Sequence, residues 1–428
     1  MTGLSLGLDL GTSGLRSAVV DADGRVLSQA RADYPGDASR DAEVWWAGAV
    51  SCLQAQVTAM RDAGLDPLAI KHVAVDGTSG SLVLVDADLR PVTRALMYSD
   101  GGFAAEASRI AEHAPDPHIT RGPSSALARL LRLQAEAEPG AARYLLHQAD
   151  FIAAQLASIG GVSDHNNALK MGFDPDVEDW PSWFDAAGVD VGLLPSVQPA
   201  GSQIAFLRSQ LAAELGLSPQ VVVHAGTTDS IAAFLASAPM QLGAAVTSLG
   251  TTLAIKILSA ERVDAPEIGL YSHRLGPFWL VGGASNTGGG VLRQFFTPEE
   301  IAALSKRIDP KTPSAFDYYP LPKPGERFPI NDPELAPRLS PRPKDDALFL
   351  GGLLEGIARI EAQCYAAVRD RGGPDPTEIF TAGGGAQNRV FTAIRERVLG
   401  RSISVAGSSE AAIGAARLAN IAVSQTGE

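Results

Sequence analysis

Two short segments, one in each half of the chain, follow the same order of strand, Gly-Thr turn and strand. Residues 10–20 read LGTSGLRSAVV, and residues 249–258 read LGTTLAIKIL. A second pair, 221–229 and 379–388, combines an apolar strand, a glycine-rich turn and a helix in each half. Repeated supersecondary units of this kind are typical of a duplicated domain. They predict a mixed α/β architecture in both copies.

The length of the chain agrees with a duplication. Its 428 residues suit two or three domains of about 100–200 residues each, and we place two domains at 1–238 and 239–428. Hydrophobic residues make up 45% and charged residues 19%, which excludes disordered, collagen-like and coiled-coil chains. No run approaches the roughly 20 apolar residues of a membrane helix, and the N-terminus lacks the basic region of a signal peptide. The two cysteines, Cys52 and Cys364, cannot form a disulfide framework, so we expect a cytoplasmic protein.

The net charge of −13 disfavours a protein that binds nucleic acids or other large polyanions, because such binding needs clustered Lys and Arg. Small phosphates remain possible ligands, since glycine-rich loops bind them through backbone N–H groups. The 44 glycines are about 10% of the chain, against an average of about 7%. They cluster in turns that follow short strands.

Hydrophobic spacing predicts most of the regular elements, with alternation for strands and a 3.6-residue period for helices. The expected strands are 6–10, 15–20, 25–30, 72–76, 81–85 and 221–224, and the expected helices are 42–63, 126–138, 230–238 and 352–369. Two segments resist such assignment. Residues 164–180 are polar and are expected to be irregular. Residues 320–343 contain eight prolines and predict an extended connector on the surface.

Several familiar catalytic patterns are absent. The chain has neither the P-loop pattern nor the GxGxxG fingerprint of dinucleotide-binding proteins. It also lacks the HExxH pattern of zinc proteases, and no GxSxG nucleophile elbow of serine hydrolases appears, since the one match to that pattern, residues 3–7, runs into an expected strand. The seven histidines are scattered without metal-ligand spacing. These absences argue against an NAD enzyme, a P-loop enzyme and a zinc enzyme.

The two Gly-Thr turns, 10–14 and 249–252, expose several backbone N–H groups and hydroxyls together. Such groups bind phosphate oxygens, and glycine lets a ligand approach the backbone closely. Either turn alone is best interpreted as an ordinary hairpin turn. Because one occurs in each half, the pair favours a nucleotide held between two domains.

Three aspartates stand at the ends of predicted strands. Asp9 interrupts an apolar strand just before the first turn, where a carboxylate suits Mg²⁺ on nucleotide phosphates. Asp229 precedes a helix, so it is either a helix cap or a base for a sugar hydroxyl. We assign Asp76, before Gly77, to local structure.

The loop 382–388, AGGGAQN, presents three successive glycines. A purine could lie against this flat surface with Asn388 at its edge, although a tight strand-to-helix turn is the simpler interpretation. The glycines at 282–283 and 288–290 resemble it in composition, and we interpret them as mobile or ligand-facing backbone.

Taken in order, these segments resemble the FGGY family of carbohydrate kinases, members of the actin-like, sugar-kinase and heat-shock ATPase superfamily. The similar segments cover nearly the whole chain: 6–13 and 248–252 for the two phosphate motifs, 225–229 for the catalytic base, 382–388 for adenosine, 410–416 for the closing signature, and 164–180 and 322–329 for two further family segments. The resemblance implies two ribonuclease-H-like domains of the actin-like ATPase type with a central cleft. The sugar would lie mainly on the first domain and ATP mainly on the second.

The same resemblance implies a mechanism. Asp229 would take the proton from a terminal sugar hydroxyl, which attacks the γ-phosphate of ATP. Asp9 would position Mg²⁺ and also touch the sugar. The residues expected to bind ATP are Gly11, Thr12, Ser13, Gly250, Thr251, Thr252, Gly383, Gly384, Gly385 and Asn388. Positioning and charge neutralisation would supply most of the catalysis.

The acceptor sugar is predicted from one short segment, Asp76 to Gly80. Xylulose and glycerol kinases of the family usually carry other residues there, and the DGTSG form is similar to the compact ribulose/xylulose kinase-like group. D-ribulose is therefore the first expectation, with Thr78 and Ser79 as sugar contacts, and D-xylulose or another pentulose or polyol is the alternative. One departure is the absence of an Arg soon after Asp100, where many relatives have one.

Two functions from other classes compete with a kinase. A sugar-responsive ATP-binding module would close its domains without transferring phosphate, but it would need no base at Asp229. A chaperone-type ATPase of the same superfamily would need a peptide-binding domain. We expect a small sugar and ATP as the only partners, no nucleic acid or membrane, and a monomer or homodimer.

Overall fold

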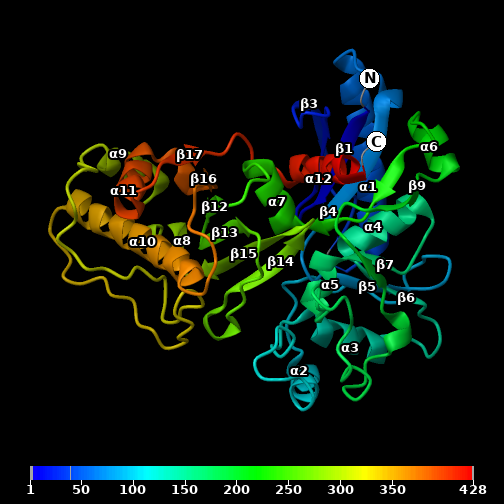
Figure 1. Ribbon diagram of the computed structural model, residues 1–428, viewed down its shortest axis with the longest axis horizontal. Coiled ribbons are helices and arrows are strands. Elements are labelled where there is room, and N and C mark those ends of the chain that lie inside the picture. Colours follow the sequence, from blue (N-terminus) through cyan, green and yellow to red (C-terminus); the bar gives the residue numbers. More distant parts are fainter. Residues whose placement is uncertain (1–2, 39, 427–428) are drawn as a thin grey trace. The chain divides into compact units, whose positions relative to one another are not determined.

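The computed structural model describes residues 3–38 and 40–426, and these residues form two compact units (Figure 1). Unit 1 contains the described residues up to Ala236 and those from Glu410 on, and unit 2 contains Ser237–Ser409. Each unit has its own β-sheet and its own hydrophobic core. The expected α/β class is confirmed.

The last helix departs from the expected limits of 1–238 and 239–428. Helix α12 (Ala411–Thr426) belongs to unit 1, where it packs against β1 (Leu4–Leu10) although the two lie at opposite ends of the sequence (Figure 1). The approach is so close that a Cβ at Gly7 would collide with the carbonyl oxygen of Ala412. Small residues at this contact allow the helix backbone to lie directly on the strand, so the last helix belongs to the compact unit that contains β1.

The sheet of unit 1 has the strand order β3-β2-β1-β4-β10-β9, with β11 beside β4. Strands β1, β2 (Leu15–Val20) and β3 (Val26–Ala32) form the expected antiparallel meander. Strands β4 (Ile70–Gly77), β10 (Val222–His224) and β11 (Thr227–Thr228) run parallel to β1, and β9 (Gln203–Phe206) is an antiparallel edge. The carboxyl ends of β1, β4 and β11 therefore lie together at one edge of the sheet.

Alternation along β1 sends its side chains to two different layers. Leu6, Leu8 and Leu10 are buried in the core formed with α1 (Ala42–Asp62) and α4 (Gln148–Ala157). Gly7 faces α12 on the other side. Asp9 shares this second face because side chains two residues apart in a strand point the same way. Its carboxylate therefore lies outside the main hydrophobic core.

The remaining elements of unit 1 are β5 (Leu82–Val85), α2 (Ala104–Ala111), α3 (Ala126–Glu136), β6 (Tyr144–His147), β7 (Val162–Asp164), α5 (His165–Met171), β8 (Ser196–Gln198), α6 (Ser209–Leu215) and α7 (Asp229–Ser237). Several of them form a smaller part around a separate hydrophobic cluster, whereas α6 packs into the main core and α7 packs beside β2 and α12. The irregular structure expected for 164–180 is wrong in its first part. Asp164 caps α5 by accepting bonds from the backbone N–H groups of Asn166 (2.7 Å) and Asn167 (3.1 Å), and these polar residues are buried.

The sheet of unit 2 repeats the plan of unit 1. Its order is β14-β15-β13-β12-β16-β17. Strands β12 (Ala244–Leu249), β13 (Leu253–Ser259), β14 (Tyr271–Leu275) and β15 (Phe278–Ser285) are antiparallel, and β16 (Glu378–Ala382) and β17 (Ile403–Val405) run parallel to β12. In both units, antiparallel strands that include the predicted hairpin are followed in the sheet by parallel strands, which are β4, β10 and β11 in unit 1 and β16 and β17 in unit 2.

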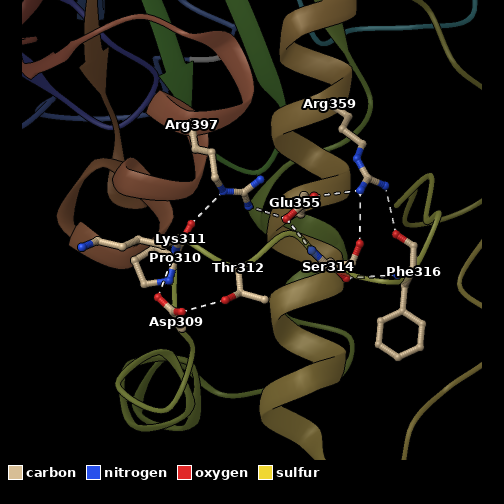
Figure 2. Close-up of polar contacts among 9 residues, drawn as sticks. All are labelled: Asp309, Pro310, Lys311, Thr312, Ser314, Phe316, Glu355, Arg359 and Arg397. Carbon is tan, nitrogen blue, oxygen red and sulfur yellow. Dashed lines mark hydrogen bonds and ion pairs between the residues drawn. The ribbon is translucent and has the colours of Figure 1, made fainter.

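Four helices cover the sheet of unit 2: α8 (Gly289–Leu292), α9 (Pro298–Ser305), α10 (Asp346–Arg369) and α11 (Arg389–Leu399). Helix α10 begins six residues before the expected start because Asp345 caps it. A buried carboxylate on α10, Glu355, accepts bonds from Ser314 N (2.9 Å), Arg359 (2.7 Å) and Arg397 (2.5 Å). Figure 2 shows how this network fastens the loop after α9 to α10 and α11.

The proline-rich segment 320–343 lacks regular helices and strands, as expected, but it is more than a surface connector. Leu321 and Phe328 are completely buried in the core of unit 2, and Glu326 is 2% exposed.

A second correction concerns Gly282 and Gly283. They lie inside β15, where a Cβ at Gly283 would meet the ring of Phe328 at 2.7 Å, so close packing explains them.

Among the described residues, no helix combines the length and the apolar character needed to cross a bilayer. Both cysteines, Cys52 and Cys364, are buried as free thiols.

Candidate active site

Strand pairing brings three aspartates together at the carboxyl edge of the unit 1 sheet. Asp9 on β1 is the register partner of Asp76 on β4. Asp76 is in turn the partner of Thr227 on β11, two residues before Asp229. In a parallel pair, register partners point to the same face of the sheet. The carboxyl groups of Asp9, Asp76 and Asp229 are close enough to influence one another electrostatically.

The environment favours protonation of two of these carboxyls. Asp9 is 5% exposed, and burial raises its pKa to about 6, although a hydrogen bond with Asp76 and the charge of Arg16 oppose the rise. Asp76 is completely buried, and neither of its oxygens accepts a bond from an N–H or hydroxyl group of the described residues. Burial, reinforced by the charges of Asp9 and Asp229, raises the pKa of Asp76 well above its ordinary value. Asp76 is therefore more than the local turn residue that the sequence indicates.

Arg16 brings a positive charge to the cluster. It is the register partner of Asp9 on β2, and its guanidinium lies 3.6 Å from Asp9 Oδ2 and 3.2 Å from Glu410 Oε2. The side chain is half exposed, so it also faces solvent. Sequence reasoning did not name Arg16, yet the predicted hairpin already placed it opposite Asp9.

The first Gly-Thr turn, residues 10–14, is called here the first phosphate-type turn, and it is a tight hairpin. Gly11 N donates to Gly14 O (3.0 Å), and the hydroxyl of Tyr34 donates to Gly11 O (2.9 Å). Thr12 and Ser13 are exposed at its tip. The turn follows Asp9 directly, so the exposed hydroxyls and the carboxyl cluster belong to one surface of unit 1.

The expected sugar contacts differ in their surroundings. Thr78 is buried, and both its backbone N–H and its hydroxyl lie within hydrogen-bonding distance of Gln148 Oε1 (2.9 and 2.7 Å). Its hydroxyl is also 2.6 Å from that of Ser81. Ser79 is partly exposed. The structure thus uses Thr78 to fix the loop after β4, and contact with a sugar stays a prediction for both residues.

The second phosphate-type turn, residues 249–252, is hydrogen-bonded to the start of α8. Gly289 N donates to Gly250 O and Gly290 N donates to Thr251 O, both at 2.9 Å. Gly288 has φ 141°, and a Cβ there would lie 2.9 Å from Thr251 O, so only glycine fits this close approach. The carbonyl oxygens of Gly250 and Thr251 thus already accept hydrogen bonds from the protein. The hydroxyl of Thr251 also accepts a bond from Arg293 (2.8 Å).

This turn borders a pocket of about 810 Å³ within unit 2. Five of the residues expected to bind ATP line it: Gly250, Thr251, Gly384, Gly385 and Asn388. Gly288 and Gly289, which the sequence analysis interprets as mobile or ligand-facing backbone, also line it. Sequence reasoning missed the side chains of the wall, which include Leu292, Arg293, Ile301, Lys306, Leu354 and Ile357. Apolar side chains from four helices together with three cationic residues, Arg293, Lys306 and Arg389, suit a ligand with a flat apolar part and an anionic part.

Two expected nucleotide residues have structural roles as well. Gly383 has φ 84°, and a Cβ there would lie 2.6 Å from Leu249 O, so it packs the loop 382–388 against the turn. Asn388 caps α11 by accepting a bond from Phe391 N (3.1 Å), and its amide donates to Ser305 (2.8 Å). A helix cap of this kind was the simpler interpretation of the loop, and the pocket beside it keeps the adenosine interpretation open to test.

The donor set in unit 1 fits a magnesium ion that is only partly bound by protein. No group of three His, Cys, Asp or Glu side chains able to hold a metal occurs among the described residues. Mg²⁺ commonly takes one or two carboxylates and completes its shell with water and substrate phosphates. Asp9, at the edge of the phosphate-type turn, offers such a carboxylate.

Comparison with known proteins identifies the family. The N-terminal domain of the FGGY family of carbohydrate kinases matches residues 4–236, and the C-terminal domain of that family matches residues 245–423. The chain belongs to the FGGY family of carbohydrate kinases. It is thus related throughout its length to enzymes that transfer phosphate to a sugar hydroxyl.

The individual relatives are distant. Xylulose kinase from Escherichia coli is 24% identical over 97% of this chain and 90% of its own length. Gluconokinase from Bacillus subtilis is 22% identical over 72% of this chain and 63% of its own length. The solved structure of xylulose kinase from Rhodospirillum rubrum has a TM-score of 0.84 at 22% identity, covering 98% of this chain and 89% of that one. The expected actin-like ATPase fold of this family is confirmed.

Proposed function

We propose that this FGGY kinase transfers the γ-phosphate of ATP to the terminal hydroxyl of a ketopentose. The observation that carries the proposal is the carboxyl cluster of Asp9, Asp76 and Asp229 beside the exposed turn of Gly11, Thr12 and Ser13. The proximity of these carboxyls and this turn at one edge of the unit 1 sheet supports a base at Asp229 and phosphate binding at the turn.

Asp229 is the proposed general base. It is the first residue of α7, and its partly buried carboxylate follows the two buried threonines of β11. It takes the proton of the sugar hydroxyl as the oxygen forms a bond to the γ-phosphorus, and the bond to the ADP oxygen breaks. A positioned base contributes a rate factor of about 10²–10⁴ in such steps.

Asp9 is the proposed magnesium ligand and also a sugar contact. When bound, Mg²⁺ would neutralise charge on the phosphates. Arg16, opposite Asp9, keeps a positive charge next to this carboxylate and half exposed to solvent. Since both phosphate-type turns expose Thr or Ser hydroxyls, we assign Gly11, Thr12, Ser13, Gly250, Thr251 and Thr252 to the phosphates.

The pocket of unit 2 is the proposed adenosine site. Its wall of Gly384 and Gly385 is free of side chains, and Leu354 and Ile357 contribute apolar surface. Such a wall suits a purine ring. Gly383 and Asn388 hold this loop in place, and Asn388 also borders the pocket.

D-ribulose is the proposed acceptor, and D-xylulose is the alternative. The first choice rests on the segment Asp76 to Gly80, and the alternative is supported by the named xylulose kinases among the relatives. A few side chains of the site decide between the two sugars, so the choice needs a direct comparison of both as substrates.

The test is an ADP-release assay with ATP and Mg²⁺ against D-ribulose, D-xylulose, other pentuloses, pentitols, gluconate and glycerol. We expect the highest kcat/KM with D-ribulose and loss of that rate in Asp229→Ala. A higher value with D-xylulose would select the alternative sugar. ADP release that is the same with and without every sugar would contradict the kinase assignment, and tight ATP and sugar binding without turnover would indicate a sugar-responsive module.

A further inference from the structure

Glu326 is a buried carboxylate held entirely by neutral donors. Its Oε2 accepts bonds from the hydroxyls of Ser285 (2.6 Å) and Tyr319 (3.1 Å), and its Oε1 accepts bonds from the backbone N–H groups of Asn286 (2.7 Å) and Arg327 (2.9 Å). It is 2% exposed. Burying a charge without a cation is costly unless every oxygen is well bonded. Four convergent donors show that the site is built to hold a carboxylate.

The donors on one side of Glu326 belong to the segment between β15 and α8, residues 285–288. Additional bonds tie this segment to the proline-rich loop that carries Glu326. The hydroxyl of Thr287 donates to Pro320 O (2.6 Å), and the amide of Asn286 donates to Gly325 O (2.9 Å). The proline-rich loop and the segment 285–288 therefore form one fastened block.

That block continues directly into the second phosphate-type turn. Leu253 N donates to Thr287 O (2.7 Å), and the N–H groups of Gly289 and Gly290 donate to the carbonyls of Gly250 and Thr251. Gly250, Thr251, Gly288 and Gly289 all line the pocket of unit 2. A continuous path of bonds thus leads from the Glu326 carboxylate to the edge of that pocket.

We propose that Glu326 is a positioning residue that fixes the second phosphate-type turn for nucleotide binding. The inference rests on the proposed role of this turn and of the unit 2 pocket. A carboxylate accepts several hydrogen bonds and donates none, so it satisfies all four donors at once. A glutamine would keep one oxygen for the two backbone N–H groups and turn its NH₂ group toward the two hydroxyls, so the bonds that Ser285 and Tyr319 donate to the charged Oε2 would be lost. The hydroxyl hydrogens would have to turn away from this site, which would loosen residues 285–288 and, through them, the turn.

The experiment compares Glu326→Gln with the matched variant Glu355→Gln. Glu355 is an equally buried carboxylate of unit 2, but its partners are Arg359, Arg397 and Ser314, none of which lines the pocket (Figure 2). For each variant, ADP affinity is measured by calorimetry without sugar. The KM values for ATP and for the sugar and the melting temperature are measured in parallel.

We expect Glu326→Gln to weaken ADP binding and raise the KM for ATP by about tenfold or more, as the loss of two buried hydrogen bonds implies. The KM for the sugar should stay within about twofold. Glu355→Gln should lower the melting temperature yet leave ADP affinity within about twofold, because its partners lie off the path to the turn. If Glu326→Gln does not fold, Ser285→Ala removes one donor only and should weaken ADP binding about threefold to fivefold.

Unchanged ADP affinity in a folded Glu326→Gln or Ser285→Ala variant would overturn the inference. Equal losses of ADP affinity in Glu326→Gln and Glu355→Gln would also overturn it, since they would show only a destabilised unit. Failure of phosphoryl transfer alone is visible separately as wild-type ADP binding without sugar-dependent ADP release, and failure of the proposed nucleotide site is visible as a wild-type protein that binds no ADP. That result would remove both proposals, whereas failure in the variants alone removes only the role of Glu326.

Discussion

The buried carboxyl groups of the two units differ in their hydrogen-bond and charge partners. In unit 1, Asp9 and Asp76 are register partners, the charge of Asp164 acts on Asp150, and burial raises the pKa of all four carboxyls. In unit 2, Glu361 is paired with Arg395 through two bonds (2.6 and 2.7 Å), and Glu326 is held by four neutral donors. Glu355 is paired with two arginines, and its pKa is lowered.

This difference indicates a division of labour. Groups with raised pKa values in a cleft or at a strand edge are candidates for proton transfer and metal binding, because their charge is not already neutralised. Carboxylates whose oxygens already accept several hydrogen bonds or ion pairs serve to stabilise the fold. We therefore expect substitutions in unit 1 to change the chemistry and those in unit 2 to change stability or nucleotide binding.

The largest effect expected in unit 1 is that of Asp229→Asn. Removal of the proposed base should lower kcat by about 10³-fold or more, because the sugar hydroxyl keeps its proton. ADP binding to the unit 2 pocket should be unchanged. Single-turnover phosphoryl transfer and ADP calorimetry check the two halves of the prediction, and a residual rate within tenfold of wild type would assign the base elsewhere.

The largest effect on stability is expected for Glu361→Gln in unit 2. Arg395 is completely buried, and its guanidinium also donates to Thr381 (2.8 Å). Removing the partner charge leaves this arginine unpaired, which typically costs about 3–5 kcal/mol. Urea unfolding measures the loss.

Asp76→Asn sharpens the same contrast with the opposite sign. Because the Asp76 carboxyl has no N–H or hydroxyl donor among the described residues, the amide should leave the unfolding free energy at pH 7 within about 1 kcal/mol of wild type, or raise it. A loss as large as that of Glu361→Gln would show that the two units do not differ in this way.

A third comparison uses pH. Asp164 is completely buried with a pKa raised to about 6, so the folded protein keeps a proton there that the unfolded chain has released. The stabilising contribution is full below the ordinary pKa of 3.8 and is lost as the pH rises through about 6. We expect unfolding free energy to fall by about 1–3 kcal/mol from this group between pH 5 and pH 7.5. Asp164→Asn, which still caps α5, should flatten that slope, and an identical slope would exclude Asp164 as its source.

How far the sequence led can be judged at particular residues. The hairpins around Gly11 and Gly250 were predicted because strand alternation and Gly-Thr turns are local signals. The partnership of Asp9 with Asp76 was missed, since it depends on parallel pairing between β1 and β4, which no local pattern encodes. The prolines of 320–343 correctly predicted the absence of helices and strands, but they carry no information about inward side chains such as Glu326.

The helix α12 shows the same limit at the level of domains. Residues 410–416 resemble the closing signature of the family, but no helix was predicted there, and nothing in the sequence indicated that this segment lies against β1. The return of the chain to β1 is a tertiary event. It brings Glu410 to Arg16, so the electrostatics of Asp9 depend on the last segment of the chain as well as the first.

The smallest predicted effect tests this electrostatic link directly. Below a pH of about 6 Asp9 becomes protonated, so kcat/KM should fall on the acid side with a midpoint near that value. Arg16 holds the pKa of Asp9 down. Arg16→Gln removes this charge, so the acid limb should move to higher pH by about half a unit, a modest shift because Arg16 is half exposed and screened by solvent.

Glu410→Gln supplies the opposite test, because Glu410 raises the pKa of Asp9 and its loss should move the limb slightly to lower pH. Opposite shifts in the two variants would show that the acid limb reports the protonation of Asp9, the carboxyl on which the charges of Arg16 and Glu410 act. Shifts of the same sign, or none, would assign the limb to another group, and the carboxyl cluster of unit 1 would then lose its claim to the chemistry.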